Sequence, residues 1–123
     1  MVKKMVATES EVVEWIRDFL KNRVAGKKVV EKRISERDLT GGLHEFVLFR
    51  IFGDDEVLLV KIGEDSLKLT YSTATLKSDR VDELESRGFL VEKEGDYYKA
   101  HIKLSISELK QEYVNVLLAS CIG

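Results

Sequence analysis

Two apolar runs near the middle of the chain, FVLF and VLLV, form the strongest hydrophobic pattern in the sequence and lie within residues 43–62. They are separated by Gly53, Asp54, Asp55 and Glu56, a composition typical of a tight turn between paired strands. Both runs are apolar at consecutive positions, whereas a strand with one wet face alternates apolar and polar residues. We therefore predict a hairpin that is covered on both faces, either by helices on both sides of the sheet or by a second copy of the chain.

The residues before the hairpin have the periodicity of an amphipathic helix over residues 8–25. Thr8 and Glu11 have the spacing of a capping box, and Gly26 can end the helix in the left-handed conformation. Trp15 is expected at the edge of the apolar face, where an indole ring can be half-buried. The apolar face has the spacing i, i+1, i+4, i+7 and i+8 and consists of Val12, Val13, Ile16, Phe19 and Leu20.

The hairpin is expected to belong to a four-strand antiparallel meander. A strand over residues 29–39 has one polar side and turns at Thr40, Gly41 and Gly42 into the hairpin. The fourth strand, residues 67–71, alternates apolar and polar side chains and so predicts one buried face.

The C-terminal half of the chain predicts a short helix, a second hairpin and a last helix. The short helix begins with Ser78 as its cap and ends before Gly88. The hairpin strands FLVEK and YYKAHIKL join at residues 94–96, and Ser105 with Glu108 predicts a second capping box for a helix over 106–121. The prediction is a single α+β domain over residues 1–123, in two layers and in the order αββββαββα. Its mostly antiparallel sheet combines the four-strand meander with the hairpin, beside three helices.

Composition narrows the class of protein without identifying a function. Hydrophobic residues make up 44% of the chain and charged residues 34%, and the formal net charge of −2 gives no overall attraction to nucleic acid or anionic membranes. Abundant Glu and Lys with few Asn and Gln are similar to the usage of hyperthermophile proteins. The chain has one cysteine, no secretion signal and no run of about 18 apolar residues, so we expect a cytoplasmic protein without membrane association.

No motif for catalysis, metal binding or cofactor binding is found in the sequence. His44, His101 and Cys121 do not have the paired spacings of a zinc site, and the glycines do not follow a phosphate-binding pattern. No nucleophile elbow is present either. We therefore expect a non-enzymatic protein that uses no metal and no cofactor, an interaction module of unassigned pathway.

The last helix suggests self-association, because it is apolar most of the way round. Leu109, Tyr113, Val116 and Leu117 form a normal core stripe, and Val114, Leu118 and Cys121 form a second stripe beside it. Such a helix is either buried on several sides or pairs with another molecule, and we predict that the second stripe contacts a second copy or another protein. The order of elements is similar to that of bacterial type III secretion chaperones, which implies a small homodimer.

Nucleic-acid binding is the alternative function. The outward face of the last strand carries Tyr97, Lys99, His101 and Lys103, and aromatic and basic groups on a sheet can stack bases and neutralise phosphates. A second explanation of this face is an edge strand that lysines protect from aggregation. The segment 78–104 also resembles the recognition helix and wing of winged-helix proteins, a resemblance that implies DNA binding.

Overall fold

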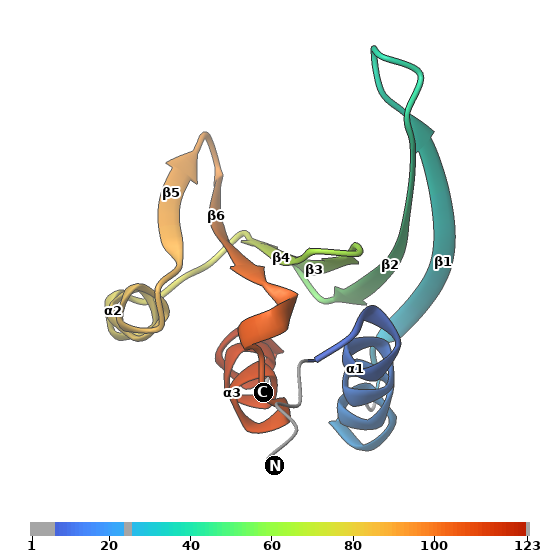
Figure 1. The fold of residues 1–123 in the computed structure, drawn as a ribbon. Helices are drawn as coiled ribbons and strands as arrows, with labels where there is room; N and C mark the ends of the chain where they lie inside the picture. The colour runs from blue at the N-terminus through green and yellow to red at the C-terminus, as the bar shows by residue number, and fades with distance from the viewer. Residues whose placement is uncertain (1–6, 24–25, 123) are drawn as a thin grey trace.

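The computed structural model of the chain describes residues 7–23 and 26–122, and Figure 1 shows its fold. It confirms the α+β class and the order αββββαββα, with three helices and one antiparallel sheet of six strands. The elements are α1 (Glu9–Arg23), β1 (Lys28–Arg37), β2 (Leu43–Gly53), β3 (Glu56–Ile62), β4 (Ser66–Thr73), α2 (Ser78–Ser86), β5 (Leu90–Glu94), β6 (Tyr97–Ser105), a 3₁₀ turn (Ile106–Glu108) and α3 (Gln111–Ile122).

The meander and the second hairpin form one continuous sheet in the order β1-β2-β3-β4-β6-β5. All three helices lie on one side of this sheet, and the two outer hairpins rise away from them, so that the other side is concave (Figure 1). No described element covers that concave side. Of the two arrangements expected for the central hairpin, helices on both sides is therefore wrong for the described part of the chain.

The core lies between the sheet and the helices. A row of directly opposed residues crosses four strands, in which Ile51 faces Leu58, Leu58 faces Tyr71 and Tyr71 faces Ala100. All four are buried, because paired residues of neighbouring strands point to the same side of a sheet. The alternation expected for residues 67–71 is confirmed, since Leu67, Leu69 and Tyr71 all point to the helices.

Helix α1 forms largely as the sequence predicts. The Thr8 hydroxyl accepts a hydrogen bond from the Glu11 backbone N–H at 3.3 Å and donates one to the Glu11 carboxylate at 3.2 Å. Gly26 adopts the left-handed conformation with φ 82°, and the predicted apolar face of α1 is buried. Arg17 pairs with Glu31 of β1, which fixes α1 beneath the edge of the sheet.

Two predicted helix caps are wrong. Ser105 and Glu108 form no capping box, and the Ser105 hydroxyl is instead hydrogen-bonded to the Ser107 hydroxyl at 3.0 Å. The backbone N–H of Ile106 donates to the carbonyl of Asp65 and extends the β6 pairing beyond the strand. A 3₁₀ turn follows, and α3 begins only at Gln111. Ser78 is the first residue of α2 rather than its cap, a position held by Lys77 without a side-chain hydrogen bond.

The second apolar stripe of α3 faces the core of its own chain. Val114, Leu118 and Cys121 are fully buried, so these side chains offer no surface to a second copy. The exposed large hydrophobic residues of α3 are Tyr113 and Val116, which are 39% and 37% exposed. Burial within one chain accounts for the apolar character of this helix.

Leu118→Ala and Val116→Ala form a matched pair that tests this burial. We expect Leu118→Ala to lower the free energy of unfolding by about 2 to 5 kcal/mol, since it leaves a cavity in a closed core. Val116→Ala should change it by no more than about 0.5 kcal/mol, because the site is on the surface and alanine favours helices. Urea denaturation measures both values. Equal effects, or a Leu118→Ala chain of unchanged stability, would contradict this placement.

Candidate functional site

The uncovered side of the sheet, called here the open face, concentrates positive charge. By strand register it carries three glutamates, Glu36, Glu92 and Glu94, against seven basic side chains, which are Lys28, Lys32, Arg50, Lys61, Lys68, Lys99 and Lys103. The chain as a whole has a net charge of −2. The open face therefore has a surplus of four positive charges, while the rest of the chain has a surplus of six negative charges.

Three of these lysines form a row across neighbouring strands. Lys61 of β3 lies directly opposite Lys68 of β4, and Lys68 lies directly opposite Lys103 of β6. Like charges in directly opposed positions destabilise a sheet. The opposition of Lys68 and Lys103 is thus a feature that folding does not require. Together with Lys61, these two lysines produce a surface that attracts anions.

The apolar part of the open face lies over β1, β2 and β3. It consists of Val30, Ile34, Phe46, Leu48, Phe52, Val57 and Leu59, most of them half-buried. The ammonium of Lys61 lies 4.2 Å from the centre of the Phe46 ring, a cation–π contact that covers the aromatic side chain. Basic and aromatic groups are therefore interleaved on this surface.

A hollow of about 330 Å³ lies at one end of the open face. Phe52 and Tyr97 line it, and these rings are 38% and 43% exposed. Asp55, from the turn between β2 and β3, closes one end, and the hydroxyl of Tyr97 donates to the Glu94 carboxylate at 2.9 Å. Exposed rings with carboxylates nearby suit a flat ligand that carries N–H donors, such as a nucleobase.

The four residues predicted for nucleic-acid binding lie together on the open face. Tyr97 and Lys103 are exposed, and Lys99 and His101 are partly exposed. Strand β6 lies between β4 and β5, but β5 pairs only with residues 97–101, so β6 has a free edge at Lys103. Protection of an edge therefore does not explain Lys99, and it remains an alternative explanation for Lys103.

Sequence reasoning missed the partners of these residues. Lys61 and Lys68 belong to other strands, and only the register of the folded sheet places them beside Lys103. The alternation of Lys68 with Thr70 and Ser72 was the available signal, since it marked the polar side of β4.

The segment that resembles a winged-helix unit is built differently. Its hairpin is part of the main sheet, because β6 pairs with β4 from residue 98 to residue 105. Its helix α2 exposes Asp79, Asp82, Glu83 and Glu85, whose charges repel phosphates.

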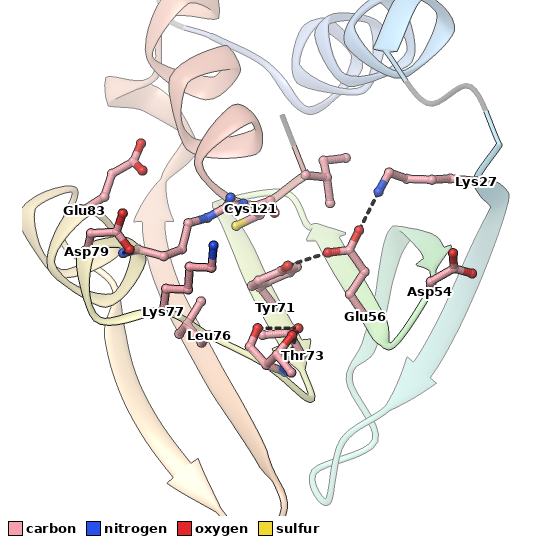
Figure 2. A pocket seen from close by; sticks show the side chains of 13 residues that line it. Lys27, Asp54, Glu56, Tyr71, Thr73, Leu76, Lys77, Asp79, Glu83 and Cys121 are labelled. Carbon is pink, nitrogen blue, oxygen red and sulfur yellow. Dashed lines mark hydrogen bonds and ion pairs between the residues drawn. The ribbon is translucent and has the colours of Figure 1, made fainter.

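A second site lies on the helix side, where β3 begins and β4 ends. It is a polar pocket of about 560 Å³ between the start of α2 and the end of α3 (Figure 2). At its centre the Glu56 carboxylate accepts hydrogen bonds from the Lys27 ammonium and from the Tyr71 hydroxyl. Arg80 closes the opposite wall, where its guanidinium donates to the carbonyls of Ser120, at 2.9 Å, and Cys121.

The charges in this pocket are compensated by one another. Burial is the largest influence on Glu56 and raises its pKa, but hydrogen bonds from Lys27 and Tyr71 and the charge of Lys27 outweigh it, so the pKa lies below its usual value. Burial also raises the pKa of Cys121 to about 12, which keeps the thiol protonated at neutral pH. Glu56 is therefore charged and joins β3 to β4 through Tyr71 and to the residue before β1 through Lys27, while the thiol of Cys121 is neutral. Arg80 joins α2 to the end of α3 at the same corner.

Two further expectations concern metals and membranes. Within residues 7–23 and 26–122, no group of three or more His, Cys, Asp or Glu side chains could hold a metal ion. Among the helices described, none is both long and apolar enough to cross a membrane.

Glu56→Gln tests the corner through its pH dependence. The folded pKa of Glu56 lies below the value of 4.5 expected for an unfolded chain, so its contribution is complete above pH 4.5 and is lost as pH falls through the folded pKa. At pH 7 we expect the variant to lose about 1 to 3 kcal/mol of unfolding free energy. This deficit should shrink progressively below pH 4.5 in denaturation curves recorded at several pH values.

Glu64→Gln is the matched control, because Glu64 is exposed in the turn between β3 and β4. It removes the same charge and should leave the free energy of unfolding nearly unchanged at every pH value. A Glu56→Gln deficit that stays constant with pH would contradict the assigned role of the carboxylate.

Comparison of the chain with protein-family models, with curated proteins and with solved structures finds no match in any of the three.

Proposed function

We propose that the protein is a non-enzymatic binding module whose open face binds single-stranded nucleic acid. The observation that carries this proposal is the row of Lys61, Lys68 and Lys103, directly opposed on three adjacent strands. A polyanion that lies along the row neutralises a repulsion present in the free protein. Binding therefore gains from releasing this repulsion as well as from releasing the counterions of the phosphates.

The arrangement favours a strand with unstacked bases over a duplex. An exposed pair of rings on a sheet can stack bases only when those bases are free of a double helix. The hollow between Phe52 and Tyr97 lies near Ser72, four residues along β4 from Lys68, or about 13 Å. A single nucleic-acid strand can thus place phosphates at the lysine row and a base in the hollow.

The side chains around the row and the hollow give the two parts of the open face different ligand preferences. Lys99 lies opposite Ser72, and His101 lies opposite Thr70, so donors fill the stretch between the row and the hollow. Carboxylates lie only toward the hollow and the outer edges, where Asp55 and Glu94 can accept hydrogen bonds from base amino groups. Phosphates are accordingly expected at the row and bases at the hollow.

The double variant Lys68→Glu/Lys103→Glu tests the phosphate contacts. We expect its affinity for a single-stranded oligonucleotide to fall more than about tenfold, and the slope of log K against log salt to decrease by about 1.4, because two contacts are removed. Fluorescence anisotropy of a labelled oligonucleotide over a salt series measures both values.

Lys21→Glu/Lys110→Glu is its matched control, since it makes the same change of net charge at exposed positions on α1 and before α3. It should retain most of the affinity and the slope of the unchanged protein. The proposal fails if the unchanged protein does not bind at low salt, or if both double variants lose affinity equally.

Tyr97→Ala and Tyr113→Ala separate base stacking from simple attraction of polyanions. The two tyrosines are similarly exposed, at 43% and 39%, but Tyr113 lies on α3. We expect Tyr97→Ala to weaken oligonucleotide binding by about 1 to 3 kcal/mol, the value of one stacked base. The affinity for inorganic polyphosphate should be unaffected in both variants. If Tyr97→Ala weakened the binding of the oligonucleotide and of polyphosphate equally, the face would bind polyanions without stacking bases.

A further inference from the structure

Strand β1 is a long edge of the sheet, and no described strand pairs with its outer side. It spans ten residues, Lys28–Arg37, whereas the opposite edge, β5, spans five. Most of its side chains are exposed, and none is fully buried. An edge of this length presents a row of free backbone donors and acceptors that another strand can pair with.

The open-face side chains of β1 can pair favourably with those of a second, antiparallel copy of β1. Lys28, Val30, Lys32, Ile34 and Glu36 follow one another as positive, apolar, positive, apolar and negative. If two copies of β1 pair antiparallel about a twofold axis at Lys32, then Lys28 faces Glu36 of the second copy and Val30 faces Ile34 of the second copy. Each of these pairs occurs twice by symmetry, and such pairs stabilise a sheet.

The helix side of β1 is complementary in the same register. Glu31 faces Arg33 of the second copy, and Val29 faces Ser35 of the second copy. Within one chain Glu31 already pairs with Arg17, and Arg33 already pairs with Glu9, which lies 3.5 Å away. Lys28 and Glu36 form no ion pair with another described residue, so the Lys28–Glu36 contact is the one that dimerisation alone would satisfy.

Neighbouring registers are less favourable. An axis at Glu31 opposes two glutamates at the centre and sets Lys32 against Val30. An axis at Arg33 opposes two arginines at the centre, sets Lys32 against Ile34 and sets Val30 against Glu36. An axis at Ile34 pairs opposite charges again, but only residues 31–37 overlap and Lys28 is left outside. The axis at Lys32 pairs residues 28–36 and opposes only one like pair, Lys32 with its own copy.

We propose that the protein forms a homodimer by antiparallel pairing of β1 with β1 of a second copy, about a twofold axis at Lys32. The pairing joins the two six-stranded sheets into one sheet of twelve strands and makes the two open faces continuous. It requires no nucleic acid and uses none of the lysines of the row. Its failure would therefore leave the proposed function untouched, and the reverse also holds.

Cysteine cross-linking at the axis tests the register. Directly opposed residues of antiparallel strands have Cα atoms about 4.5 to 5.5 Å apart, within reach of a disulfide. Lys32→Cys should therefore give a covalent dimer under mild oxidation. Ile34→Cys should not, because two copies of residue 34 stand four register positions apart, or about 13 Å.

The native Cys121 can be kept in both variants, since it is fully buried. The cross-linked fraction is read on a non-reducing gel, and the unchanged protein serves as the blank. Cross-linking of Lys32→Cys alone supports the proposal. Equal cross-linking of both variants, or preferential cross-linking of Ile34→Cys, overturns it.

Charge reversal tests the pairing without a covalent bond. Light scattering of the unchanged protein should report twice 14.1 kDa. Lys28→Glu or Glu36→Lys alone turns two attractive pairs into two repulsive ones and should weaken the dimer about tenfold or more, while the double variant Lys28→Glu/Glu36→Lys restores opposite charges and should recover it. Both sites are exposed, so thermal unfolding should show that all variants fold. A monomeric unchanged protein, or a double variant as weak as the single ones, overturns the proposal.

Discussion

The structure depends on burial on the helix side of the sheet. Apart from Phe46, which is buried on the open face, the buried side chains of the sheet point toward α1, α2 and α3, and rows of directly opposed residues such as Ile51, Leu58, Tyr71 and Ala100 hold the strands in register against that layer. A shift by one residue would turn each strand's buried set to the solvent, so the helical layer fixes the register of the whole sheet. The side chains of the open face consequently also lie in fixed positions relative to one another.

The open face meets water without a protein layer, and its basic side chains have two distinct causes. Around Phe46, a basic side chain covers apolar surface, because the ammonium of Lys61 lies over the ring in a cation–π contact. Lys68 and Lys103 have no such task, because their neighbours on this face, Ser66, Thr70 and His101, are polar. Structural need explains the first kind of lysine and leaves the second to function.

Periodicity within single segments predicted most of the fold. The apolar face of α1, the alternation of β4 and the turns at glycines such as Gly26 depend on residues close in sequence, and they formed as expected. The helix expected from residue 106 begins only at Gln111, and the backbone N–H of Ile106 is bonded to a distant group, the carbonyl of Asp65, which extends the strand pairing. The local signal at Ser105 gave no indication of this long-range hydrogen bond.

The site was harder to predict than the fold, for a related reason. A single strand showed the face of Tyr97, Lys99, His101 and Lys103, but not the opposed lysines on β3 and β4, because cross-strand register is a property of the folded sheet. The second stripe of α3 likewise led us to predict contact with another molecule rather than burial within the chain, since the sequence does not show how many neighbours surround one helix. Both the missing lysines and the buried stripe depend on which elements become neighbours in space.

The two proposals meet at the β1 edge, and thermodynamics then constrains how they relate. Pairing about Lys32 places the two copies of Lys32 directly opposite each other and leaves this pair as the one repulsive contact of the interface. A polyanion that crosses the joined open faces would neutralise that pair and so would bind the dimer more tightly than the monomer. Linkage requires the converse by the same factor, so that a bound strand strengthens the dimer as much as dimerisation strengthens binding. The open face and the free edge would then be one system, in which the charge that opposes assembly is also the charge that the ligand removes.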